Sequence, residues 1–189
     1  MILVLTTPRT GSSWFCNFLS EQHQYNNLGE FFNVASMSAN HQTAKLEYLE
    51  DNPNSIIKCF PYHLNSSYKQ FQTAAFVEKS IFKLADKIYI LIRRNFHAQC
   101  KSLYVCAVTG YWGSNPQPQR KIPLNRDLFE ECTVFLKNNY QNLAEYNKKF
   151  NCELVCYEDM LTDENRYHNP VIWLDQPDYV EFDVEALFV

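Results

Sequence analysis

The sequence predicts an α/β fold in which helices flank a central, mainly parallel sheet of about four to five strands. Short apolar runs, typical of strands buried on both faces, alternate along the chain with longer segments whose apolar residues recur at helical spacing. This alternation favours a parallel sheet, because each intervening helix can return the chain to the starting edge of the sheet. A chain of 189 residues, 46% of them hydrophobic, suffices for one domain with a sizeable core.

Four apolar runs are the predicted strands. Residues 2–5 form the first, and residues 55–60 form the second, which stops at Pro61 because proline has no N–H for a sheet. Residues 87–92 (Lys-Ile-Tyr-Ile-Leu-Ile) are the clearest run, and residues 153–157 are the last. A sheet of these strands would be buried on both faces.

Helices are predicted between the strands, where apolar residues fall on one helical face. The predicted helices are the segment that follows a polar turn at residues 6–13, and residues 45–50, 68–85, 96–108 and 127–150. A loop at residues 109–116 separates the last two helices.

Acidic residues gather at the end of the chain. The formal net charge is −4, and residues 175–189 contain five Asp or Glu and no Lys or Arg. The five negative charges of this segment leave the rest of the chain at about +1. We therefore expect one domain at residues 1–174, followed by an acidic tail at 175–189 that is poorly ordered or loosely docked.

Composition excludes several classes of protein. A pI near 5.7 argues against a general nucleic-acid binder but leaves room for a small anionic ligand. Seven cysteines, an odd number with no CxxC pair, are typical of free thiols in a reducing cytosol, and no metal-ligand spacing is present. No signal peptide precedes the first strand, and no apolar run approaches the ~20 residues of a membrane helix. We expect a cytoplasmic protein without a membrane partner.

The turn at residues 6–13 has the features of an anion site. Backbone N–H groups at the start of a helix that follows a parallel strand converge on one point, and the helix dipole favours negative charge there. Arg9 adds a charged donor, Ser12 and Ser13 add hydroxyls, and Gly11 allows close approach of a ligand. The alternative is an ordinary turn in which Ser12 or Ser13 caps the helix. The turn is not a Walker A loop, because the second glycine and the lysine of GxxxxGK[ST] are missing.

A second polar segment follows the strand at 87–92. Arg93 and Arg94 stand at the carboxyl end of that strand, where open α/β sheets bind ligands. Ser102 follows Arg94 by eight residues, about two helical turns, so the two side chains can grip the same phosphate. The alternative is a pair of surface arginines with a serine that faces solvent.

Three ordered motifs carry a family resemblance. Thr6-Thr7-Pro8-Arg9-Thr10-Gly11-Ser12-Ser13-Trp14 resembles the 5′-phosphosulfate loop of the sulfotransferases that use 3′-phosphoadenosine 5′-phosphosulfate (PAPS). Arg94-Asn95 with Ser102 resembles the 3′-phosphate motif of that family, and Tyr157-Glu158-Asp159-Met160 resembles its Y-E-D-[LM] motif. The three motifs imply a P-loop-like three-layer α/β fold.

The resemblance also implies which residues would bind PAPS, and release the product adenosine 3′,5′-bisphosphate. Arg94 and Ser102 would hold the 3′-phosphate, while Trp14 and Tyr157 would pack on the adenine, unless they are core aromatics. The 5′-phosphosulfate would be held by the loop and the start of the helix, through Arg9, Thr10, Gly11, Ser12, Ser13 and Trp14. No metal is needed in this scheme.

Sulfuryl transfer also needs groups that stabilise charge and remove a proton. Arg9 and Lys58 suit the first task, since Lys58 ends a central strand where the family often has a lysine. Phe60 stands where the cytosolic small-molecule branch has its basic histidine, so the resemblance favours the bacterial and carbohydrate-acting branches. In Leu28-Gly29-Glu30-Phe31-Phe32, Glu30 matches the base of some bacterial members, and His63 is the second candidate.

The predicted function is therefore transfer of a sulfuryl group from PAPS to a hydroxyl of a carbohydrate or other small metabolite. Tyr111 and Trp112, between Gly110 and Gly113, are the expected acceptor-facing or lid segment. Two alternatives remain open: a non-catalytic nucleotide-binding module and a P-loop-type nucleotide kinase. The sequence predicts neither the acceptor nor the oligomeric state.

Overall fold

The fold is built on a five-stranded sheet in which every pair of neighbouring strands is parallel, in the order β2-β3-β1-β4-β6. The computed structural model describes residues 1–33, 39–64, 74–112, 120–160, 171–173 and 175–189. The strands of the sheet are β1 (Ile2–Thr6), β2 (Asn26–Asn27), β3 (Ser55–Cys59), β4 (Lys87–Ile92) and β6 (Glu153–Cys156). The predicted α/β fold, with a parallel sheet of four to five strands flanked by helices, is confirmed.

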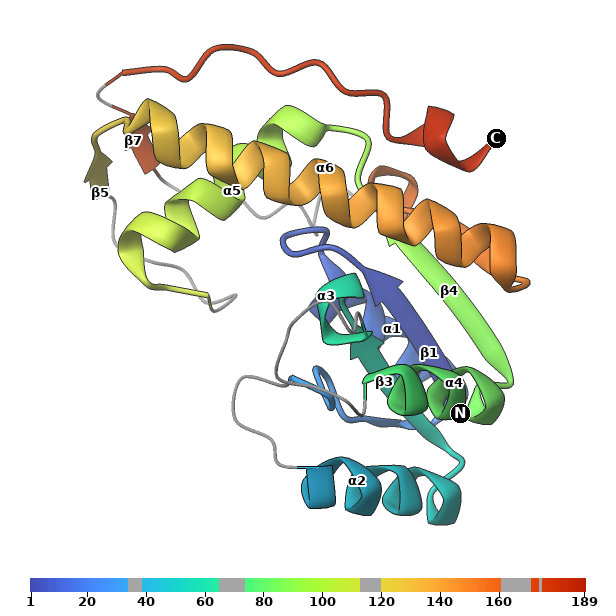
Figure 1. The fold of residues 1–189 in the computed structure, drawn as a ribbon. Helices are drawn as coiled ribbons and strands as arrows, with labels where there is room; N and C mark the ends of the chain where they lie inside the picture. The colour runs from blue at the N-terminus through green and yellow to red at the C-terminus, as the bar shows by residue number, and fades with distance from the viewer. Residues whose placement is uncertain (34–38, 65–73, 113–119, 161–170, 174) are drawn as a thin grey trace.

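Side chains that alternate along β1 enter two separate apolar clusters, one on each face of the sheet. Ile2 and Val4 belong to the smaller cluster, which the first helix closes, whereas Leu3 and Leu5 belong to the larger one. All the later α-helices contribute to the larger cluster, and in Figure 1 α4 lies in front of the sheet and α1 behind it. The helices are α1 (Ser12–His23), α2 (Ala39–Asp51), α3 (Pro61–Leu64), α4 (Ala74–Leu84), α5 (Phe96–Thr109) and α6 (Arg126–Lys149).

Several elements depart from the sequence-based expectation. Helix α2 begins at Ala39 rather than at residue 45, within a stretch too polar to show a helical pattern. Strand β2 was not predicted because its two residues are asparagines, which enter the sheet by pairing with β3. A second, two-stranded parallel sheet joins β5 (Arg120–Ile122) to β7 (Val171–Trp173). Of the helix predicted at 68–85, residues 68–73 lie outside the described part, as do residues 113–116 of the predicted loop.

The acidic tail is packed against the body of the protein, so the expectation of a loosely docked appendage is wrong. Val184 is only 1% exposed and belongs to the larger cluster, and the Phe182 ring lies 4.7 Å from that of Phe96. The segment passes along α6 in Figure 1 and ends in the short helix η3 (Glu185–Phe188), which contacts α6. Apolar residues alternate with the acidic ones here, so the tail can bury one side while its carboxylates face outward.

The cysteines are all free, and all but Cys152 are buried. Burial raises the pKa of the Cys16 thiol to about 12 and that of Cys100 to about 11, which keeps both thiols uncharged at neutral pH. Among the described residues, no helix is long and apolar enough to span a membrane.

Candidate functional site

The parallel sheet brings the predicted site residues to one edge. Strands β1, β3, β4 and β6 run in the same direction, so the segments that follow them meet at their carboxyl ends. The turn after β1 carries Arg9, β3 carries Lys58, Arg93 follows β4, and Tyr157 follows β6.

The turn after β1 is shaped by two left-handed residues. Arg9 has φ 66° and Gly11 has φ 84°, and Gly11 is the N-cap of α1 without a side-chain cap. A non-glycine residue in this conformation costs roughly 1–2 kcal/mol, so other contacts must hold Arg9 there. The alternative in which a serine side chain caps α1 is thus not what the structure contains, because Ser12 is already the first helical residue.

Gly11 cannot carry a side chain without moving Tyr157. A Cβ built on Gly11 would lie 2.3 Å from Cε2 of the Tyr157 ring, well inside van der Waals contact. The ring thus packs directly on the backbone of the turn, and it also lies 5.3 Å from the Arg93 guanidinium. Tyr157 is held by these contacts at the turn, while its predicted role on adenine stays a prediction.

Arg9 and Ser102 are in direct contact. The Arg9 Nε donates to Ser102 Oγ at 3.0 Å, and Arg9 Nη1 donates to the carbonyl of Trp112 at 3.3 Å. The two predicted anion-binding motifs therefore meet at one point, although 93 residues separate these side chains. The Trp112 side chain is 57% exposed beside them, so this part of the predicted acceptor-facing segment reaches the site.

Lys58 connects Glu30 to the turn. Its Nζ donates to Ser13 Oγ at 3.2 Å and lies 3.1 Å from Glu30 Oε1. The Lys58 side chain is 7% exposed and that of Glu30 is 34% exposed, so the carboxylate remains accessible while the ammonium is buried. The segment that carries Glu30 is fixed to β3, because the Lys58 N–H donates to the Gly29 carbonyl at 2.7 Å.

Arg94 faces carboxylates rather than the turn. Its guanidinium donates two hydrogen bonds to Asp159, one of them 2.7 Å long, and its Nε lies 2.9 Å from Glu185 Oε2 in the tail. Glu158 accepts the backbone N–H groups of Arg94 and Asn95, each at 2.9 Å. These contacts explain how the Tyr-Glu-Asp segment holds the end of β4, and the role of Arg94 on a 3′-phosphate stays a prediction.

His63 is buried next to Lys58 in a fixed protonation state. Its Nδ1 accepts the Phe60 N–H at 3.3 Å, so the proton of the neutral ring sits on Nε2. Burial, with the charge of Lys58 as a second cause, lowers the pKa of His63 to about 4. The Nε2 atom is buried and finds no partner among the described residues.

The side chains of two predicted site residues, Trp14 and Thr10, contact other parts of the protein. Trp14 stacks on Phe18 with ring centroids 5.6 Å apart and packs against the smaller apolar cluster. The Thr10 hydroxyl is buried and donates to the Thr7 carbonyl at 2.9 Å, which leaves only its backbone N–H for a ligand.

One residue at the turn was missed from the sequence. Gln99 on α5 is fully buried and donates through Nε2 to Thr7 Oγ1 at 2.7 Å and to the Pro8 carbonyl at 2.6 Å. A signal was present, because Gln99 precedes Ser102 by three residues and so lies on the same helical face.

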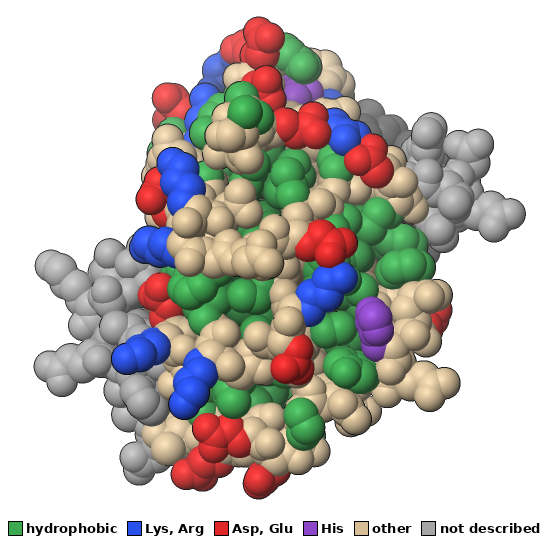
Figure 2. Space-filling model, turned by 90° about the vertical axis from the view of Figure 1, so that its right-hand side faces the viewer, with side chains coloured by type: hydrophobic (Ala, Val, Ile, Leu, Met, Phe, Trp, Pro, Cys, Tyr) green, Lys and Arg blue, Asp and Glu red, His purple; other side chains and the backbone are tan. Residues whose placement is uncertain are grey.

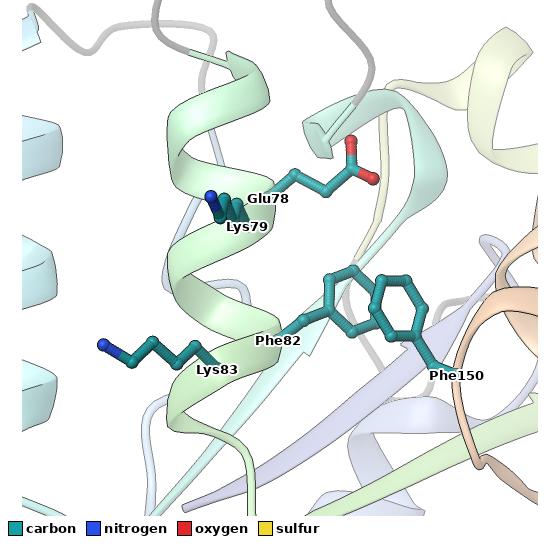
Figure 3. Close-up of a pocket in the computed structure, with 5 residues that line it drawn as sticks. All are labelled: Glu78, Lys79, Phe82, Lys83 and Phe150. Carbon is teal, nitrogen blue, oxygen red and sulfur yellow. The ribbon is translucent and has the colours of Figure 1, made fainter.

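On the face shown in Figure 2, acidic and basic side chains are interspersed among apolar and neutral ones. A surface hollow between α4 and the end of α6 is lined by Phe82 and Phe150, whose rings stack at 3.7 Å, and by Glu78, Lys79 and Lys83 (Figure 3). It contains none of the predicted site residues. Within the described ranges, no cluster of His, Cys, Asp or Glu could hold a metal ion.

The fold and the site together define an α/β protein with cations gathered at a strand-to-helix turn. No protein-family model and no curated protein sequence matches the chain. Among solved structures, a gluconokinase from Sinorhizobium meliloti 1021 matches with a TM-score of 0.39 and 11% identity, over 82% of this chain and 81% of that chain. A likeness at this level says nothing about activity.

We predict that Gly11→Ala lowers the free energy of unfolding by about 2 kcal/mol more than Gly110→Ala does. Both glycines have positive φ, but a Cβ on Gly110 would meet nothing within 4 Å, so only the Gly11 variant displaces the Tyr157 ring. Urea unfolding of the two variants measures the difference. Equal losses would mean that Tyr157 does not pack on the turn.

We also predict an acid-sensitive contribution from His63. Because its folded pKa lies below the ordinary 6.5, the unfolded chain binds a proton there that the folded chain does not. The contribution of neutral His63 to the free energy of unfolding is fully present above about pH 6.5. It is lost as the pH falls towards about 4, the pKa of His63 in the folded protein. Between pH 7 and 5 the wild type should lose roughly 2 kcal/mol more stability than His63→Asn, whose amide oxygen can still accept the Phe60 N–H. The control is His23→Asn at an exposed position, which should behave as the wild type.

Proposed function

We propose that the protein is a sulfotransferase that moves a sulfuryl group from PAPS to a hydroxyl of a carbohydrate or other small metabolite. The contact between Arg9 and Ser102 is the main support. In the resemblance, Arg9 belongs to the 5′-phosphosulfate loop and Ser102 to the 3′-phosphate motif, so one ligand that spans both motifs would explain why these side chains meet.

The residues at the turn suit an anion with several charges. Arg9, Lys58 and Arg93 supply three cations near the start of α1, where the helix dipole also favours negative charge. Gly11 allows the Tyr157 ring to pack directly on the backbone of the turn. PAPS, when bound, supplies the activated sulfuryl group, and the chain supplies its orientation and the charge that stabilises the departing phosphate.

Glu30 is the proposed general base. Its partly exposed carboxylate can accept the proton of an acceptor hydroxyl as that oxygen forms its bond to sulfur. Lys58, which bridges Glu30 and Ser13, is placed to stabilise the phosphate oxygen as its bond to sulfur breaks. The hydroxyl proton thus goes to Glu30, and adenosine 3′,5′-bisphosphate leaves.

His63 is less suited to this task. The Nδ1 lone pair already accepts the Phe60 N–H, and Nε2 carries the proton of the neutral ring. Neither nitrogen can therefore take a proton from an acceptor hydroxyl. Both the burial of the ring and its low pKa support a structural place for His63 under the site.

A bound 3′-phosphate would have to replace carboxylates around Arg94. The Arg94 ion pairs with Asp159 and Glu185 join partly exposed side chains. Exposed pairs of this kind are screened by solvent and contribute little to stability. A dianionic phosphate held by Ser102 as well can therefore compete with them.

A parallel α/β sheet of this kind is equally compatible with a nucleotide kinase. The residues of the turn after β1 therefore distinguish the sulfotransferase proposal from the kinase alternative. A kinase reaction needs a group to hold the β- and γ-phosphates, and the Walker lysine is absent from residues 6–13. A non-catalytic nucleotide-binding module would use the same cations without Glu30.

Adenosine 3′,5′-bisphosphate should raise the melting temperature, and Arg9→Ala and Arg94→Ala should each weaken its binding about 10- to 100-fold, because each removes a charged hydrogen bond. Titration calorimetry measures the affinities. Arg126→Ala is the control, since it removes an exposed arginine whose ion-pair partner is Asp178 in the tail. No binding at millimolar ligand would contradict the proposal, and tighter binding of Mg-ATP would favour the kinase.

Glu30→Gln should keep the affinity for the bisphosphate and slow sulfuryl transfer by about 10²-fold or more, because the amide cannot accept the proton. Transfer from labelled PAPS to a panel of sugars and small alcohols measures the rate, with Glu47→Gln on α2 as the exposed control. Binding without turnover by the wild type would point to the non-catalytic module, and full activity of Glu30→Gln would exclude Glu30 as the base.

A further inference from the structure

The carbonyl groups of the turn after β1 are tied to the interior of the protein. The Pro8 carbonyl accepts from Gln99 Nε2 at 2.6 Å, and the Arg9 carbonyl accepts from Arg93 Nη1 at 3.0 Å. The donors come from α5 and from the end of β4, so two separate elements hold two consecutive peptide groups.

These two hydrogen bonds set the direction of two backbone N–H groups. In a trans peptide the C=O and the following N–H point in opposite directions. With the Pro8 carbonyl directed at Gln99, the Arg9 N–H points away from Gln99. With the Arg9 carbonyl directed at Arg93, the Thr10 N–H points away from Arg93. Successive N–H groups that face outward from a turn form the concavity in which anions bind.

Gln99 is held so that only one orientation of its amide satisfies its neighbours. Its Nε2 donates to both Thr7 Oγ1 and Pro8, and its Oε1 accepts from the Tyr140 hydroxyl at 2.7 Å. The side chain is fully buried. An exchange of the amide oxygen and nitrogen would set the oxygen against the Pro8 carbonyl, so the amide works as a fixed donor.

Arg93 is fixed by the same tyrosine. Its backbone N–H donates to the Tyr140 hydroxyl at 3.1 Å, and its guanidinium lies 5.3 Å from the Tyr157 ring. Its Nε is buried and lies 4.0 Å from Glu158 Oε1, with no hydrogen-bond partner among the described residues. Its one firm side-chain bond therefore goes to the carbonyl of Arg9, the residue whose φ is left-handed.

We propose that Gln99 and Arg93 are positioning residues for the anion-binding turn. Gln99 directs the Arg9 N–H, and Arg93 directs the Thr10 N–H and keeps Arg9 left-handed, with its side chain towards Ser102. The effect on ligand binding rests on the proposed function, because it needs an anion at the turn. The effect on the backbone does not.

The first test needs no ligand. The three-bond coupling between the amide and α protons of Arg9 reports its φ, and it is measured by NMR on the free protein. Arg93→Met and Gln99→Met should change this coupling, and Arg93→Lys should restore part of it. Ile81→Val, a buried change on α4, is the control and should leave it unchanged.

The second test measures affinity for adenosine 3′,5′-bisphosphate by calorimetry. Arg93→Met and Gln99→Met should each weaken binding at least ten-fold, with partial rescue by Arg93→Lys. In an Arg9→Ala background Arg93→Met should lose the part of its effect that comes from the direction of the Arg9 side chain. It should keep the part that comes from the Thr10 N–H, because the carbonyl of residue 9 is still present. If Gln99→Met does not fold, the Arg93 variants still test the proposal, because the Arg93 side chain is partly exposed and its replacement is less disruptive.

The outcomes separate the two proposals. An unchanged Arg9 coupling in the Arg93 variants would overturn the positioning role whatever the ligand does. A changed coupling in a protein whose wild type binds no bisphosphate would support the positioning role and contradict the proposed function. A changed coupling with unaltered affinity would overturn the claim that the turn must be held in place to bind an anion.

Discussion

The position of β1 at the centre of a fully parallel sheet is the constraint on which the rest of the structure depends. Its five residues are all buried, and it pairs with β3 on one side and β4 on the other. No side chain of β1 can therefore reach solvent, and the chain must turn sharply when the strand ends at Thr6. Because the neighbouring strands end at the same edge, residues far apart in sequence are brought to that turn.

The turn after β1 is stabilised by hydrogen bonds that its carbonyl groups accept from side chains of the protein. A buried carbonyl without a donor costs more than the hydrogen bond itself contributes, so each peptide in the turn needs an internal partner. Gln99, Arg93 and the Thr10 hydroxyl supply these partners. The same bonds that stabilise the turn leave its N–H groups directed outward. In the proposed function, this arrangement links the stability of the fold to the binding of an anion.

Charges at the site are balanced in pairs drawn from distant segments. Lys58 meets Glu30, and Arg94 meets Asp159 and a glutamate of the tail. The acidic tail therefore has a structural contact with the site edge, in addition to the apolar contacts that bury Val184. Composition suggested an isolated acidic appendage, because a count of charges does not show that apolar residues alternate with them.

The sequence alone was sufficient to predict four of the five strands of the main sheet, the longer helices between them, and the strand-to-helix turn with Arg9 and Gly11. These features follow from local patterns: buried parallel strands are continuously apolar, and a turn into a helix needs polar residues and glycine. Strand β2, the docking of the tail and the place of Gln99 depend on partners far away in the chain. Only the tertiary structure decided that Arg9 reaches Ser102, that Lys58 joins Glu30 to Ser13, and that Arg94 turns to carboxylates, because the direction of a long charged side chain is set by what the folded chain places around it.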